Sequence, residues 1–176
     1  MMISELTKAK HAVELSHLGE ILKAGLGYSS QLVESSEDVP IPFLVTAIPQ
    51  DEQGRDRYLN FIFVPAPDEE LQALELLQIH TLVPCRLVEA SRADTERLIG
   101  AMNRKAGLGC MGVDEADNVY YKYVFAKGKY ALFDPDVVAE MVQLLVYVVE
   151  RFSGLVEGVA TGQQDVAAAL RAVEGM

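Results

Sequence analysis

The sequence contains no tryptophan and only two cysteines, Cys85 and Cys110, among 176 residues. They match no zinc-site spacing such as C-x-x-C, and we expect both thiols to be free in a reducing cytosol. The longest run without a charged residue, residues 39–50, has 12 residues and three prolines, whereas a membrane-spanning helix needs about 20 apolar residues. The first residues also lack the apolar stretch of a signal peptide. We therefore expect a cytoplasmic protein without disulfides or a membrane span.

Basic residues are also scarce, because 15 Lys and Arg against 26 Asp and Glu give a formal net charge of −11. Such a charge repels nucleic-acid phosphates and anionic lipids, so we expect no nucleic acid and no membrane among the partners. Half of the residues are hydrophobic and 23% are charged, which is typical of a folded globular domain. We predict one α+β domain over residues 1–176, with a core at 1–153 and a C-terminal extension at 154–176 that contains a short helix.

Residues 1–87 show the patterns of one helix followed by three strands. Ser4 is a suitable N-cap, and Gly25 or Gly27 can end the helix, while residues 34–40 are polar and predict a loop. Residues 43–49 and 58–64 are rich in β-branched and aromatic residues and predict an antiparallel hairpin. Residues 71–87 fit a strand or part of a helix; we favour an edge strand, where Pro84 is tolerated.

The second half predicts a helix, a hairpin and a long helix. Ser91 and Asp94 form a pattern like a capping box, and Gly107 can end that helix. Residues 110–113 and 119–126 predict a hairpin with an acidic tip. Asp134 followed by proline begins a helix that runs to about Phe152, and residues 164–173 predict a last helix. The expected fold is α+β: an antiparallel sheet of about five strands with helices packed on it, in the order helix, three strands, helix, β-hairpin, long helix, C-terminal helix.

The sequence contains letters or residue types of several catalytic and cofactor motifs, but none occurs in the structural context that its function requires. Residues 107–112 match the letters G-x-G-x-x-G, but a helix precedes them and a strand follows, the reverse of a dinucleotide-binding loop. His11, Glu14 and His17 share one arc of a helix and could bind a metal, but an exposed helix flank carries the same residues. Nothing activates the Cys85 thiol. We therefore predict a protein without enzymatic activity, metal or cofactor.

Apolar residues exceed what one sheet packed on one face needs. The long helix is apolar on more than one stripe, and both faces of the strands carry bulky side chains. This surplus predicts either a core enclosed by helices or a surface for another protein. The candidate partner-binding residues are Phe43, Val45, Tyr58, Asn60, Ile62 and Phe63. The candidate dimer-interface residues are Leu98, Met102, Val138, Val142 and Leu145.

A family resemblance covers residues 98–152. It is carried by the helix end at Asn103 and Arg104, by the aromatic strand 119–125 after an acidic tip, and by the Asp134-Pro135-Asp136 start of a long Val/Leu helix. Lys105 and Ala106 stand where a second asparagine often occurs. This segment resembles the YbjN-type, type III secretion chaperone-like family. The resemblance implies a small, acidic, non-enzymatic and usually homodimeric protein that holds extended segments of client proteins.

The expected function is therefore a chaperone- or adaptor-like module that binds another protein or an extended peptide segment. The resemblance implies that it is a homodimer. The alternative is a small-molecule-sensing or signal-transduction regulatory domain with a pocket between the sheet and the long helix.

Overall fold

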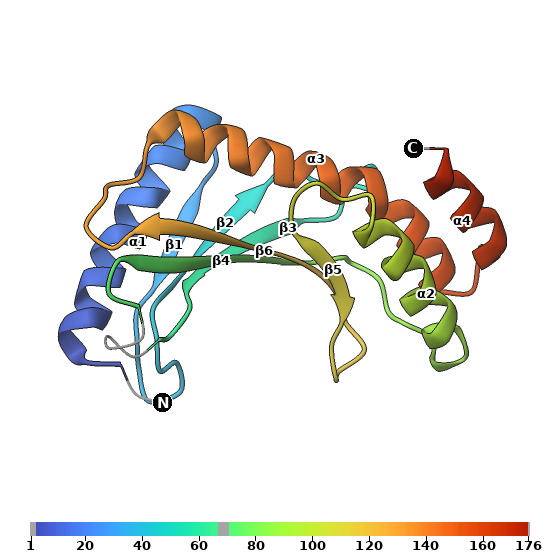
Figure 1. Cartoon of the computed structure of the whole chain (residues 1–176), viewed down its shortest axis with the longest axis horizontal. Helices are drawn as coiled ribbons and strands as arrows, with labels where there is room; N and C mark the ends of the chain where they lie inside the picture. Colours follow the sequence, from blue (N-terminus) through green and yellow to red (C-terminus); the bar gives the residue numbers. More distant parts are fainter. Residues whose placement is uncertain (1–2, 67–70, 176) are drawn as a thin grey trace.

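The computed structural model describes residues 3–66 and 71–175 and has an α+β fold, with a six-stranded antiparallel sheet and four helices packed on it (Figure 1). The elements in chain order are α1 (Glu5–Leu26), β1 (Ser30–Val33), β2 (Phe43–Ile48), β3 (Arg57–Phe63), β4 (Leu74–Leu82), the 3-10 turn η1 (Glu89–Ser91), α2 (Arg92–Asn103), β5 (Cys110–Val113), β6 (Val119–Gly128), α3 (Pro135–Ala160) and α4 (Val166–Glu174).

The strands lie in the order β1-β2-β3-β4-β6-β5, and every neighbouring pair is antiparallel. Helix α3 runs along the sheet, with α1 near one end and α2 and α4 near the other (Figure 1). The core lies between these helices and one face of the sheet, where Leu59, Phe61, Ile79 and Tyr121 are fully buried. Within the described ranges, no helix has both the length and the apolar character that crossing a membrane requires.

The structure confirms the helix at the start of the chain and both predicted hairpins. The Ser4 hydroxyl accepts a hydrogen bond from the Thr7 amide, and Gly27 ends α1 with a φ of +72°, a conformation that costs glycine little. Asp134 caps α3 by accepting hydrogen bonds from the amides of Asp136 and Val137. The local signals at these positions therefore specify the ends of α1 and the start of α3.

Two strand predictions are wrong. Strand β1 was not expected, because it has only four residues and begins with the polar pair Ser30 and Gln31; it forms by pairing with β2. The strand favoured for residues 71–87 is confirmed as β4, but it is not an edge strand, because it pairs with β3 on one side and β6 on the other. Pro84 lies beyond the last residue of β4, so it removes no hydrogen bond from the sheet.

Two helix predictions also need correction. The side chain of Ser91 makes no capping hydrogen bond, because η1 leads directly into α2, and α2 ends at Asn103 rather than near Gly107. Helix α3 does not end near Phe152 but continues to Ala160, with Val156 and Val159 buried. The predicted boundary at residue 153 therefore falls inside a helix.

Candidate functional site

The helices cover one face of the sheet. On that face Leu44 lies against Gly19 of α1, and the Phe63 ring stacks on His11 with 4.2 Å between ring centroids. Side chains at the alternate strand positions point the other way and keep part of their surface in solvent. We call this second set the open sheet face. It includes Phe43, Val45, Tyr58, Asn60, Ile62, Gln78, His80, Leu82, Tyr120, Lys122 and Val124.

The strand register arranges the open sheet face in rows that cross four strands. One row runs through Phe43, Ile62, Gln78 and Val124. The next row runs through Val45, Asn60, His80 and Lys122. The first row is mainly apolar and the second mainly polar, so the face combines contact area with groups that can hydrogen-bond a partner.

The open sheet face differs in charge from the rest of this acidic chain. None of the described strand residues that form it is an Asp or Glu. Burial lowers the pKa of His80, whose ring lies 5.4 Å from that of Tyr120, which leaves Lys122 as its main charge near neutral pH. The strand side chains of this face therefore offer a partner segment no carboxylate, although Asp56 of the β2–β3 connection lies beside Val45, Tyr58 and Asn60 at its rim.

Five of the six predicted partner-binding residues lie on the open sheet face, with Tyr58 48% exposed. Phe63 does not, because strand side chains alternate between faces and Phe63 is 3% exposed on the helix side. The contributions of β4 and β6 were not predicted. The alternation in residues 119–125 could have indicated two faces for β6, but the sequence does not show that β6 pairs with β4.

The predicted dimer-interface residues do not form a surface. Leu98, Met102, Val138, Val142 and Leu145 are each at most 1% exposed and belong to the core of the chain itself. The apolar residues of α3 instead lie on two sides of the helix. One side is buried in the core, and the other carries Val137, Leu144 and Tyr147, which are about half exposed.

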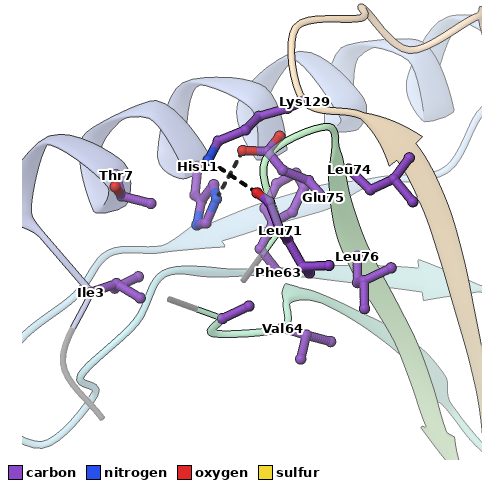
Figure 2. A pocket seen from close by; sticks show the side chains of 11 residues that line it. Ile3, Thr7, His11, Phe63, Val64, Leu71, Leu74, Glu75, Leu76 and Lys129 are labelled. Carbon is purple, nitrogen blue, oxygen red and sulfur yellow. Dashed lines mark hydrogen bonds and ion pairs between the residues drawn. The ribbon is translucent and has the colours of Figure 1, made fainter. Parts of the chain in front are cut away.

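A charged cluster lies beneath α1, and Figure 2 shows His11 turned toward Glu75 there. The Glu75 carboxylate accepts hydrogen bonds from Lys10 Nζ at 2.5 Å and Lys127 Nζ at 3.1 Å, and His11 Nε2 lies 3.6 Å from Glu75 Oε1. Burial would raise the pKa of Glu75, but the two lysines outweigh it and hold that pKa below its usual value. Burial lowers the pKa of His11 despite Glu75 and Glu14.

The cavity beside this cluster has a volume of about 30 Å³. A buried water needs roughly 10–15 Å³ measured in this way, so the cavity holds about two waters and no larger ligand. The cluster therefore joins α1 to β4 and β6 by ion pairs rather than forming a pocket for a metabolite.

The possible metal ligands of α1 do not converge. His11 points to Glu75, whereas His17 is exposed and lies 3.6 Å from Glu20. Glu14 Oε2 is 3.1 Å from Lys127 Nζ. In the part of the chain that the structure describes, no three His, Cys, Asp or Glu side chains are placed to hold a metal ion.

The glycines of residues 107–112 have a packing role. Gly109 has a φ of +68°, and a Cβ atom there would lie 2.6 Å from the Lys122 carbonyl oxygen. A Cβ at Gly112 would lie 2.5 Å from the Tyr120 hydroxyl. The segment connects α2 to β5, so these glycines let the edge strand approach the tyrosines of β6.

A polar cavity of about 350 Å³ lies between the β2–β3 connection and α3. Arg55 donates hydrogen bonds to both carboxylate oxygens of Glu157, at 2.7 and 2.8 Å. Arg57 Nη2 donates to Glu150 at 2.9 Å, while its buried Nη1 has no hydrogen-bond partner within the described residues. Burial raises the pKa of the neighbouring Cys85 thiol to about 11, so this cysteine is protonated at neutral pH and is not an activated nucleophile.

Comparison of the chain with known protein-family models and with curated proteins gives no match. Its function is therefore inferred from the surfaces described above.

Proposed function

We propose that this protein is a non-enzymatic, chaperone- or adaptor-like module whose open sheet face binds an apolar segment of another protein. The observation that carries the proposal is a sheet face with aromatic and branched side chains that are partly exposed to solvent. Its described strand residues include no Asp or Glu, in a chain of net charge −11. Interface centres are depleted in charged residues and enriched in aromatic ones. The open sheet face has this composition across four neighbouring strands.

An extended partner segment is supported by the edge of the sheet at β6. Strand β5 pairs only with Val119–Lys122, whereas β4 pairs with β6 as far as Gly128. Along residues 123–128, β6 therefore has a described strand neighbour on one side only. An extended peptide can add to such an edge through backbone hydrogen bonds and place alternate side chains on the sheet face. The resemblance of residues 98–152 to type III secretion chaperone-like proteins favours the same kind of partner.

The proposal is tested by affinity capture of partners from the native cell lysate, with Ile62→Asp and Val124→Asp compared with the wild-type protein. Both substitutions place a carboxylate in the apolar row of the open sheet face. We expect a partner that is near-stoichiometric with wild type to be lost from both variants. With the partner purified, its dissociation constant should rise at least about tenfold, since 1.4 kcal/mol corresponds to that factor.

Val13→Asp is the matched control, because Val13 is 70% exposed on α1, away from the open sheet face. This variant should bind the partner as wild type does. Circular dichroism should show that all three variants are folded. Equal binding by folded Ile62→Asp and wild-type proteins would refute the assignment of this face.

A second candidate function, sensing of a small polar molecule, is favoured by the buried Arg57 Nη1 beside the 350 Å³ cavity. Ligand pockets commonly have volumes of about 300–1,000 Å³. A thermal-shift screen with small carboxylates and phosphates tests it. A specific ligand at 100 times its dissociation constant adds about 2.7 kcal/mol of stability, and that gain should disappear in Arg57→Met. If no compound stabilises the wild-type protein, the sensing function is excluded for these ligand classes.

A further inference from the structure

Helix α3 carries one exposed stripe that the core does not use. The stripe consists of Val137, Glu140, Leu144, Tyr147, Arg151 and Gly154. These positions are separated alternately by three and four residues, which is the spacing of the contact positions in a coiled coil. Val137 and Leu144 are each 48% exposed and Tyr147 is 54% exposed. The helix lies along the outside of the molecule (Figure 1), so a second helix can approach this side.

The α3 stripe is complementary to itself when the helix is reversed. A two-fold axis between Leu145 and Val146 places position 140 opposite 151, 144 opposite 147, and 137 opposite 154 of a second helix. Glu140 then faces Arg151, and Leu144 faces Tyr147. Because a two-fold axis repeats every contact, each of these pairs occurs twice.

The unpaired groups of the α3 stripe fit this arrangement. Neither Glu140 nor Arg151 forms an ion pair within the described residues, and Arg151 Nη1 donates to the Tyr147 hydroxyl at 3.0 Å. A Cβ atom at Gly154 would have no neighbour within 4 Å, which leaves room for an opposing Val137. The stripe carries one negative and one positive side chain, so two such stripes attract although the whole molecules, at −11 each, repel.

We propose that the α3 stripe is a homodimer interface, on which α3 of a second copy packs in the antiparallel direction. The proposed interface replaces the expected residues, which are buried on α2 and α3, with the exposed side of α3. It is independent of the open sheet face. The stripe spans about 26 Å at 1.5 Å per residue. One side of a single helix is a small contact compared with the roughly 800 Å² per partner of a standard interface, so we expect the dimer to dissociate on dilution.

Sedimentation equilibrium from about 1 to 200 μM tests the pairing with Glu140→Arg and Arg151→Glu. Each single variant sets like charges against one another twice per dimer and weakens dimerisation at least about tenfold. The double variant, Glu140→Arg with Arg151→Glu, restores it. An equimolar mixture of the two single variants forms a heterodimer, because arginines of one chain then face glutamates of the other.

Glu115→Arg, which makes the same charge change as Glu140→Arg at an exposed position between β5 and β6, is the control and should dimerise at least as tightly as wild type. Three results would each overturn the proposal: wild-type protein that stays monomeric over the whole range, single variants that dimerise like wild type, or a double variant that stays as weak as the singles. Binding of a partner to the open sheet face can persist in each case, so the two proposals fail separately.

Discussion

Asn103 joins the end of α2 to the edge strand β5 through both ends of its amide. Nδ2 donates to the Met111 carbonyl oxygen at 3.0 Å, and Oδ1 accepts from the Met111 amide at 2.8 Å. Strand β5 has β6 on one side only, so the Asn103 amide takes the place of a second strand neighbour at Met111. The two hydrogen bonds give Asn103 a structural role, which is to hold β5 against the end of α2.

His11 is the residue whose titration should be visible in stability. Its pKa is lowered by burial in the folded chain, so the unfolded chain binds a proton first as the pH falls below about 6.5. Stability must then decrease with falling pH, because protons favour the state that binds more of them. Glu75, whose pKa is also lowered by its two lysine partners, adds a further loss of stability only as the pH falls below the ordinary glutamate value of 4.5.

We predict that His11→Phe reduces the pH dependence of the free energy of unfolding between about pH 7.5 and 5.5, where one proton can contribute up to about 1.4 kcal/mol per pH unit. The phenyl ring can keep the stacking on Phe63 but cannot bind a proton. Urea denaturation at several pH values measures the slope. A residual slope is expected from His80, whose pKa is lowered by burial.

His17→Phe is the control for this experiment, because His17 is 47% exposed in its side chain. Its pH profile should follow that of the wild-type protein. A His11→Phe profile that is as steep as that of wild type would contradict a buried, neutral His11.

At the scale of the element, local sequence signals predicted the start of α3 correctly but gave the wrong capping residue for α2. Asp134 with the following proline marks α3 and does cap it, whereas Ser91 with Asp94 looks like a capping box but caps nothing. The difference arises because η1 occupies the turn before α2, so Ser91 already has helical backbone angles, with φ of −98° and ψ of −2°. A capping side chain needs an extended backbone at its own residue.

Asp134→Ala should lower the free energy of unfolding by about 0.5–2 kcal/mol, the usual cost of removing an N-cap. Two amide groups, those of Asp136 and Val137, lose their acceptor. Ser91→Ala should change the free energy of unfolding by less than about 0.5 kcal/mol. If Ser91 capped α2, its replacement would cost as much as that of Asp134. Chemical denaturation of both variants decides between the two expectations, and equal losses would show that the cap geometry is not what stabilises α3.

The same contrast explains which elements could be predicted. Helix α1 and the hairpins β2–β3 and β5–β6 follow from residues close together in sequence, and the structure confirms them. Strand β1 has a weak pattern of its own and depends on β2 for its backbone partners. The position of β4 depends on β6, more than 35 residues later in the numbering, as in the pairing of Leu82 with Tyr120. No local pattern encodes such a pairing.

At the scale of the molecule, the sequence predicted only the part of the open sheet face that lies on the β2–β3 hairpin. Alternation along β3 separates Tyr58, Asn60 and Ile62 from the core, but their neighbours His80 and Lys122 are added by strands distant in sequence. The same limit applies to α3, where periodicity shows an apolar excess but not which side the sheet covers. Once the buried side is known, the remaining α3 stripe follows from the sequence.

The central position of β4 also affects how the sheet can form while the chain is being synthesised. The strands β1 to β4 can pair in sequence as they emerge from the ribosome, but the outer edge of β4 has no partner until Val119–Gly128 has been synthesised. An unpaired strand edge readily pairs with another chain. Slow translation of residues 83–118 would therefore lengthen the time in which a neighbouring nascent chain on the same messenger can take the place of β6.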